Sequence, residues 1–364
     1  MNRRSPLFLF SALTLLACAA FAQDQRTDVP KFVTLPARPA TYDQDPSASL
    51  QEWDGTLLSG YNFNMVGTNP ATTNTTTTVN VFLIPVNICV TSGGTKTCFD
   101  PKTKQSNGAS VVTNVLNSPI FKNQDYTIDG TDLGNTQYED AFQRSNFWTD
   151  VQTNPDYHVI LNPIVLPEQT LDVPAADGNL QHGQFGVPET ANVDIDYLDS
   201  LITSGLSKAK QITPASFAMI LTYDTYLTEG SCCIGGYHSA NGAQTYGEFT
   251  YTTPSGGTSF SEDVSALSHE LGEWLDDPLY PNENNSPCGI LEVGDPIEGE
   301  IGTHDFGDYT YTLNGFTYHL QDLATMHYFG QNPNTVNNTN WTFQGQTGEL
   351  PGYSKPIGEC SYGS

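Results

Sequence analysis

The chain has 364 residues, with 13 Lys and Arg against 40 Asp and Glu, which gives a formal net charge of −27. A surface this acidic, without any basic block, excludes nucleic acid and anionic membrane surfaces as partners. Aromatic residues make up 11% of the sequence and the hydrophobic fraction is 37%, so we expect most of the chain to fold around a core.

The N-terminus has the three parts of a secretory signal peptide. Two arginines follow the first two residues, residues 7–16 are apolar, and an A-x-A cleavage site ends at Ala22. We therefore predict a signal peptide over 1–22 and a secreted protein, extracellular or periplasmic, that has no membrane attachment after cleavage. The alternative interpretation is a lipoprotein box ending at Cys18, which would leave the protein anchored.

Two segments follow the signal peptide in the predicted organisation. Residues 23–78 form a lead-in that is rich in Pro and Thr and loosely structured, and it is open whether this lead-in is a removable pro-segment. Residues 79–364 form a single domain, because no linker divides them.

The cysteines predict disulfides, since an even set of six remains when Cys18 is removed with the signal peptide. Cys89 and Cys98 flank a Gly-Gly turn and are expected to pair with each other. The other four cysteines can be paired in three ways. We favour the pairings that join each of these cysteines to a distant partner. These four are Cys232, Cys233, Cys288 and Cys360.

Strands alternate with helices in the rest of the chain. Runs rich in β-branched residues predict strands over 79–90, 158–166, 216–223 and 246–251. Apolar residues at helical spacing and local breakers predict helices over 108–116, 136–147, 194–212, 262–276 and 318–329. The last of these would carry His319 and His327 as packing residues. This alternation predicts a mixed α+β or α/β domain.

The helix over 262–276 carries the most informative motif. Ser259 and Glu262 form an S-x-x-E capping box at its start, and Pro278 ends it. Its buried stripe consists of Val264, Leu267, Leu271 and Leu275.

On this helix His269, Glu270 and Glu273 form an H-E-x-x-E pattern. His269 and Glu273 lie one turn apart on the same side, so both can bind one metal ion, and Glu270 is then placed to act as general base on the attacking water. A carboxylate in place of the second His adds negative charge and makes the water less acidic. The alternative interpretation is the solvated polar face of an amphipathic helix.

A third ligand must come from elsewhere, and Glu292 is the best candidate. Eighteen residues separate it from Glu273, and the resulting H-E-x-x-E-x18-E pattern resembles that of the gluzincin metallopeptidases. The gluzincins place this Glu on a second helix, whereas the Gly and Pro residues around Glu292 indicate a loop. Further candidate ligands are Asp295, Asp277 and His304.

Four segments resemble secreted protein families. Residues 268–278 are similar to the S-H-E-L-x-E-x-x-T-D-P segment of zincin-like proteins and of the plant Exordium (phosphate-induced) family. This chain has Asp276 at the position where the Exordium segment usually has Thr. Residues 232–238 resemble the C-G-x-H region of that family, and Glu292 with Asp295 matches its E-x-x-D element. Residues 136–148 resemble uncharacterised secreted proteins of soil bacteria. Together the matches cover about a fifth of the chain.

The resemblance implies a disulfide-stabilised, zincin-like α+β fold with a mixed β-sheet and one zinc ion. The predicted metal ligands are His269, Glu273, Glu292 and Asp295, and the predicted catalytic residues are Glu270 and His238. His238 is placed either as a transition-state donor in the cleft or as a loop histidine near a disulfide. The expected function is hydrolysis of a peptide or protein substrate, and the alternative is a non-catalytic extracellular binding module that keeps this fold.

Overall fold

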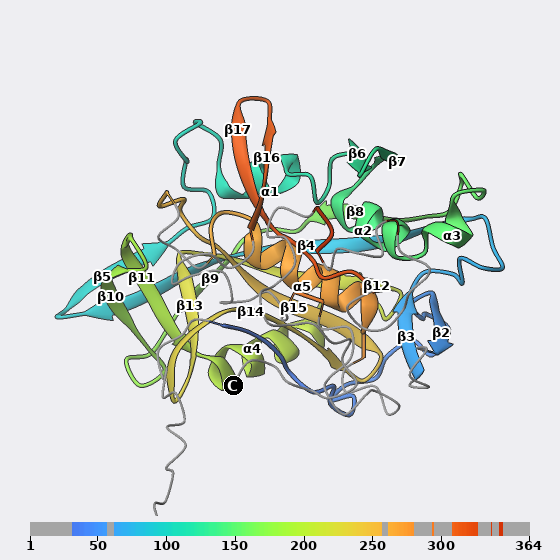
Figure 1. Cartoon of the computed structure of the whole chain (residues 1–364). Coiled ribbons are helices and arrows are strands. Elements are labelled where there is room, and N and C mark those ends of the chain that lie inside the picture. The colour runs from blue at the N-terminus through green and yellow to red at the C-terminus, as the bar shows by residue number, and fades with distance from the viewer. Residues whose placement is uncertain are drawn as a thin grey trace, which may run out of the picture.

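The computed structural model describes residues 31–56, 62–256, 261–279, 293–294, 308–326, 336 and 342–344. Within these residues the chain forms one eleven-stranded sheet, three two-stranded sheets and helices on both sides of the large sheet (Figure 1). Strands outnumber helices, and the predicted mixed α+β class is confirmed at this level.

The large sheet combines parallel and antiparallel pairs, and helix α5 lies across its centre (Figure 1). Its main strand order is β10 (Gly178–Gln184), β11 (Val187–Asp194), β13 (Thr225–Glu229), β14 (Ser231–Asn241), β15 (Gln244–Tyr251), β12 (Ser216–Tyr223), β4 (Thr76–Ser92) and β5 (Thr95–Phe99). Three more strands join it: β1 (Lys31–Thr34) pairs with β14, and β8 (His158–Val165) and β9 (Gln169–Asp172) pair with β4.

The remaining elements surround this sheet. The small sheets are β2 (Glu52–Thr56) with β3 (Asn62–Val66), β6 (Gln124–Ile128) with β7 (Thr131–Thr136), and β16 (Asp308–Leu313) with β17 (Phe316–Gln321). The helices are α1 (Val111–Asn117), α2 (Tyr138–Asn146), α3 (Trp148–Val151), α4 (Ile195–Leu206) and α5 (Ser265–Asp276). Among the described residues, no helix has both the length and the apolar character needed to cross a membrane.

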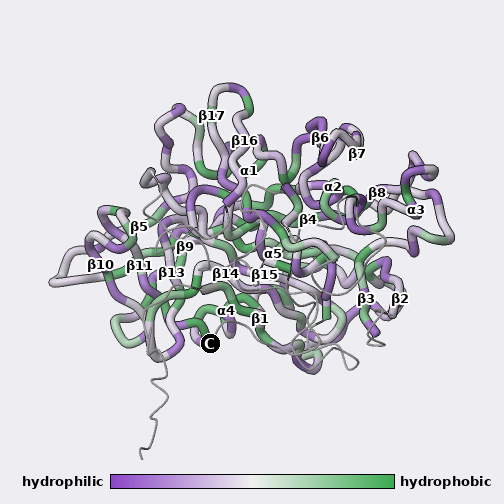
Figure 2. The backbone as a smooth tube through the Cα atoms, viewed as in Figure 1, coloured by the Kyte–Doolittle hydropathy of each residue, from purple (hydrophilic) through white to green (hydrophobic). Residues whose placement is uncertain are grey.

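Strand β12 explains why the sheet has a core on each side. Side chains alternate between the two faces of a strand, and this strand is apolar on both. Phe217, Met219 and Leu221 enter the core beneath α5, whereas Ala218 and Ile220 enter the core beneath α4. Hydrophobic segments accordingly run through the middle of the molecule, and hydrophilic ones lie mainly in the outer hairpins (Figure 2).

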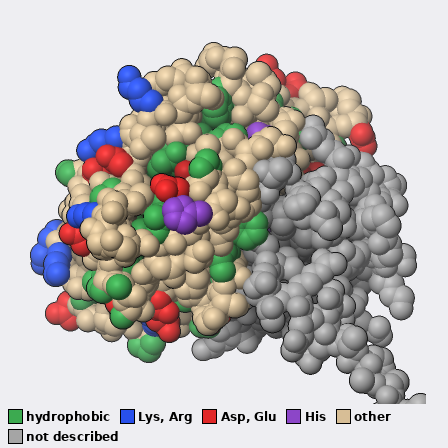
Figure 3. Space-filling model, turned by 90° about the vertical axis from the view of Figure 1, so that its left-hand side faces the viewer, with side chains coloured by type: hydrophobic (Ala, Val, Ile, Leu, Met, Phe, Trp, Pro, Cys, Tyr) green, Lys and Arg blue, Asp and Glu red, His purple; other side chains and the backbone are tan. Residues whose placement is uncertain are grey.

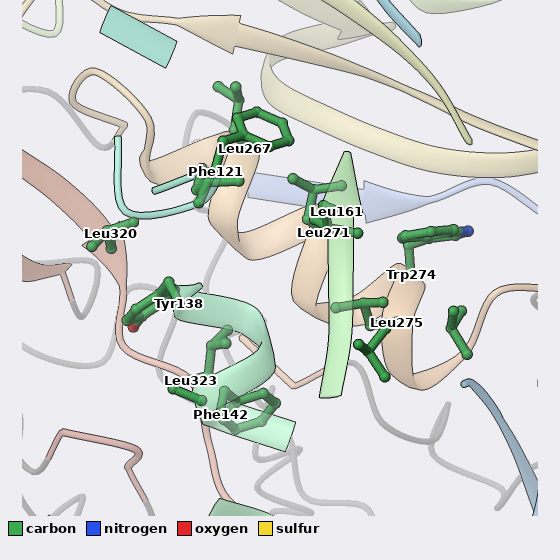
Figure 4. Packing of buried hydrophobic residues seen from close by; sticks show 14 of the residues in the cluster. Phe121, Tyr138, Phe142, Leu161, Leu267, Leu271, Trp274, Leu275, Leu320 and Leu323 are labelled. Atoms are coloured by element: carbon green, nitrogen blue, oxygen red, sulfur yellow. The ribbon is translucent and has the colours of Figure 1, made fainter. Parts of the chain in front are cut away.

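Helix α5 is anchored by its apolar side. The ring of Trp274 lies 4.3 Å from that of Phe217 on the sheet. On the helix's other flank Leu271 and neighbouring residues face α2 and the segment that follows β17, as Figure 4 shows. The labelled members of this cluster are Phe121, Tyr138, Phe142, Leu161, Leu267, Leu271, Trp274, Leu275, Leu320 and Leu323.

The strand predictions at 79–90, 158–166, 216–223 and 246–251 are confirmed by β4, β8, β12 and β15. The helix predicted over 318–329 is wrong, because residues 316–321 form strand β17, while His327 lies outside the described residues. Asn314 and Gly315, with φ of 53° and 80°, form the tight turn to β16, and this Asn-Gly signal outweighs the apolar spacing that suggested a helix.

The predicted start of the motif helix is also wrong. Helix α5 begins at Ser265 rather than at Glu262, and Ser259 lies outside the described residues. Instead of capping the helix, the Glu262 carboxylate accepts hydrogen bonds from the backbone N–H and the hydroxyl of Ser255.

The disulfide predictions are half confirmed. Cys89 and Cys98 face each other across the β4–β5 hairpin and are bonded, as expected. The preference for distant partners is wrong for Cys232 and Cys233, because these two neighbours are bonded to each other. Amide side chains approach both sulfur atoms: Gln184 Nε2 lies 2.7 Å from the Cys232 sulfur and 2.8 Å from the Cys233 sulfur. Cys288 and Cys360 lie outside the described residues.

Candidate metal centre

Helix α5 is buried on every side, since all of its residues from Ser265 to Asp276 are buried. Its apolar side packs into the core, and its polar side faces strands β14 and β15. The alternative of a solvated polar face is therefore wrong. Burial of His and Glu side chains is costly unless they are paired or bind a metal, so this arrangement indicates a site.

Four side chains converge on the polar side of α5. Nδ1 of His238, on β14, lies 2.9 Å from Oε2 of Glu270 and 3.8 Å from Oε2 of Glu273. Ligand atoms of these three residues all lie within 4.8 Å of one another, close enough to hold one metal ion. The other Glu273 oxygen, Oε1, lies 3.1 Å from Nε2 of His269, so Glu273 joins the two histidines.

The placement of His238 rules out one of its two predicted settings, and its role as a transition-state donor stays a prediction. His238 is a fully buried residue of strand β14 and contacts α5, so the interpretation as a loop histidine is wrong. Gly236 allows this close approach, because an added Cβ there would lie 3.0 Å from the Glu248 carbonyl oxygen and 3.4 Å from Cγ of Glu270.

Burial sets the charge states around the cluster. It lowers the pKa of His269, and the neighbouring His238 lowers it further, to about 3. His269 is therefore neutral at pH 7, which is the form that binds a metal.

Glu248 on β15 is a further acidic residue beside the cluster that sequence reasoning missed. Burial and, secondarily, the charge of Glu270 raise its pKa to about 8. Its Oε1 accepts a hydrogen bond of 2.6 Å from the Thr222 hydroxyl. The sequence pattern predicts that Glu248 lies in a strand. It does not predict that α5 packs over this strand and buries the Glu248 side chain.

Phe32 and Gly294 enclose His269. The Phe32 ring stacks on the imidazole with a centroid distance of 4.2 Å and an interplanar angle of 30°. A Cβ at Gly294 would lie 2.1 Å from His269 Nδ1, so only glycine fits there. The flanking candidates Glu292 and Asp295, like His304, lie outside the described residues and stay predictions, while Asp277 is buried at the C-terminal end of α5.

The chain matches no protein-family model, no curated protein and no solved structure. The function of the cluster is therefore inferred from its own geometry and chemistry.

A second charged group lies at the start of α5. His319 on β17 places Nδ1 2.6 Å from Oδ2 of Asp263 and Nε2 3.3 Å from Oε2 of Glu262. The nearby Asp308 carboxylate accepts a 2.6 Å hydrogen bond from the Ser265 hydroxyl. Burial alone would lower the pKa of His319, but the three acidic neighbours, led by Asp263, raise it to about 9.

We expect the stabilising effect of His319 to depend on pH. Its pKa is higher in the folded state, at about 9, than the usual value of about 6.5, so its stabilisation is complete below pH ~6.5 and disappears as the pH rises through 9. His319→Gln should cost ~1–3 kcal/mol at pH 6 and little at pH 10, measured by urea unfolding at both pH values. His182→Gln, at an exposed histidine, is the control and should show no such trend; equal costs at both pH values for His319→Gln would contradict the expectation.

Proposed function

We propose that the protein is a secreted, zinc-dependent hydrolase of the metallopeptidase type, with a zincin-like fold. The observation that supports this most is the convergence of two imidazoles and two carboxylates at a buried H-E-x-x-E helix. Imidazole nitrogen and carboxylate oxygen are preferred zinc ligands. The resemblance to secreted zincin-like segments agrees with this donor set.

In this proposal His269 and Glu273, whose Nε2 and Oε1 atoms lie 3.1 Å apart, hold the zinc ion. Glu292 and Asp295 are proposed as additional ligands. When bound, zinc supplies Lewis-acid polarisation of a peptide carbonyl.

Glu270 is the proposed proton acceptor. Its Oε2 is held 2.9 Å from Nδ1 of His238, which fixes the carboxylate in one orientation. The buried surroundings exclude bulk water and strengthen these polar interactions. A base held in this way takes a proton from the attacking water and returns it to the leaving amine.

One observation favours the second candidate, a non-catalytic extracellular binding module. His238, His269 and Glu270 are fully buried, and Phe32 covers His269. A closed site is typical of a structural metal, whereas a catalytic site keeps an open position.

Metal analysis combined with peptide hydrolysis separates the two candidates. We expect Glu270→Gln to keep stoichiometric zinc and to lower peptide hydrolysis by about 100-fold or more, because only the base is removed. Glu273→Gln should lose the zinc, since Glu273 contacts both histidines. Glu189→Gln, at an exposed residue, is the control and should change neither quantity.

Zinc that stays bound while no member of a broad peptide library is cleaved would support the binding module instead. A wild-type chain that binds no zinc would overturn both candidates.

A further inference from the structure

Strand β1 of the N-terminal segment lies directly beside the candidate metal centre. It pairs in parallel with β14, with Val33 opposite Tyr237 and Thr34 opposite His238. The chain then continues along the same strand, as Leu35 N–H donates to the His238 carbonyl and Arg38 N–H to the Ala240 carbonyl. Strand β1 and the residues that follow it, up to an isolated bridge at Arg38, thus run along β14 at the position of the site.

Among the residues that the structure describes, only residues 31–38 cover this stretch of β14, which would otherwise be a free edge. Strand β13 pairs with β14 only between Ser231 and Ile234, and β15 pairs along its other side. A free edge offers backbone donors and acceptors to any extended polypeptide, regardless of its sequence.

Phe32 provides the side-chain contact of this strand. It is 4% exposed and packs in a small apolar cluster that is separate from the two main cores. Its buried neighbours there are Tyr226 on β13, Cys233 on β14 and Ala266 on α5. One side of its ring stacks on His269, so this apolar cluster adjoins the candidate metal centre.

The segment has the features of a bound peptide. It combines backbone pairing along a sheet edge with one buried aromatic anchor, Phe32, and β-augmentation obtains its affinity and specificity from such features. The chain beyond it is exposed at Asp45, Pro46 and Ser47. Because the segment belongs to the same chain, its binding is intramolecular, which gives it an advantage over free peptides.

We propose that the edge of β14 beside α5 binds an extended polypeptide whose aromatic side chain takes the place of Phe32, and that residues 31–38 occupy this edge as an internal competitor. The inference rests on the proposed function, since it names the substrate class of the same site. The polypeptide binds along β14 with its aromatic side chain against Tyr226, Cys233 and Ala266.

The test uses the full chain and a labelled peptide with the sequence of residues 31–38, Lys-Phe-Val-Thr-Leu-Pro-Ala-Arg. Fluorescence anisotropy should show that Phe32→Ala binds this peptide at least about tenfold more tightly than the wild-type chain does. Val33→Ala is the matched control, because Val33 lies on the same strand but packs against the other core, and it should stay within about threefold of the wild type. The peptide with Ala in place of Phe should bind Phe32→Ala at least about tenfold more weakly.

Equal binding of both peptides, or equal binding to the wild type and Phe32→Ala, would overturn the proposal, provided that circular dichroism shows folded variants. If Phe32→Ala does not fold, a protease site inserted at Asp45–Ser47 allows the segment to be cut after folding. The Phe peptide should then displace the severed segment in gel filtration, and the Ala peptide should not. Failure of this displacement also overturns the proposal. If the peptide binds but no variant hydrolyses peptides, the proposed hydrolase function is overturned and the peptide site on β14 is retained. If peptides are hydrolysed but this peptide does not bind, the peptide site is overturned and the hydrolase function is retained.

Discussion

Replacing Glu139 by Gln is expected to stabilise the protein by an amount that grows as the pH rises. Glu139 on α2 is fully buried against α5, and its carboxyl oxygens have no hydrogen-bond partner among the described residues. Burial raises its pKa well above the usual range, and the negative charge of Asp276 adds to this effect. The folded state therefore keeps Glu139 protonated at a pH where the unfolded chain has released the proton.

The direction in which the stability difference changes with pH follows from this difference in proton binding. A carboxyl whose pKa is raised by folding destabilises the protein progressively above its unfolded value of about 4.3. The Gln side chain resembles the protonated form and has no such cost. The difference in unfolding free energy between Glu139→Gln and the wild type should be small at pH 4 and then increase by up to ~1.4 kcal/mol per pH unit.

Urea unfolding at pH 4, 5, 6 and 7 measures this trend. Glu189→Gln, at an exposed carboxylate, is the control and should stay within ~0.5 kcal/mol of the wild type throughout. A constant difference for Glu139→Gln across these pH values would show that the buried carboxyl is ionised and paired in the folded protein.

Asp199→Ala is expected to be among the most destabilising single changes. Asp199 on α4 is 1% exposed, and its Oδ1 accepts hydrogen bonds of 3.1 Å from the Tyr237 hydroxyl and 2.7 Å from the Tyr246 hydroxyl. Its Oδ2 forms an ion pair with Arg38 of the N-terminal segment. Removing the carboxylate leaves two buried hydroxyls and a cation without their shared acceptor, which should cost ~3–5 kcal/mol.

Arg38→Ala is the informative comparison, because the Arg38 side chain is 41% exposed and its loss leaves the two tyrosine hydroxyls bonded. It should cost only about 1 kcal/mol. Both values come from equilibrium unfolding of the purified chain in urea. A cost below ~1 kcal/mol for Asp199→Ala would contradict the role of Asp199 as a buried acceptor.

The sequence was sufficient for features that depend on neighbouring residues. The run of apolar and β-branched residues in β12, the Gly-Gly hairpin at Cys89 and Cys98, and the one-turn spacing of His269 and Glu273 are all local patterns. Each constrains the backbone within a few residues, and each is confirmed by the structure.

Features that depend on distant pairing could not be predicted in this way. The contact of His238 with Glu270 requires the packing of β14 against α5, and the stacking of Phe32 on His269 requires β1 to pair with β14. No periodicity within the lead-in over 23–78 indicates such a partner. The helix predicted over 318–329 was wrong for a different reason, since the local Asn314-Gly315 turn that pairs β17 with β16 was not recognised.

The sequence separation between β1 and β14 has a consequence for the order of assembly. The contact between Thr41 and Asn241 spans 200 residues, so the segment that contains β1 is synthesised long before its partner β14. Closing so long a loop is slow compared with forming hairpins such as β14–β15. The edge of β14 is therefore expected to form before residues 31–38 pair with it, and newly folded chains would pass through a period in which this edge is accessible.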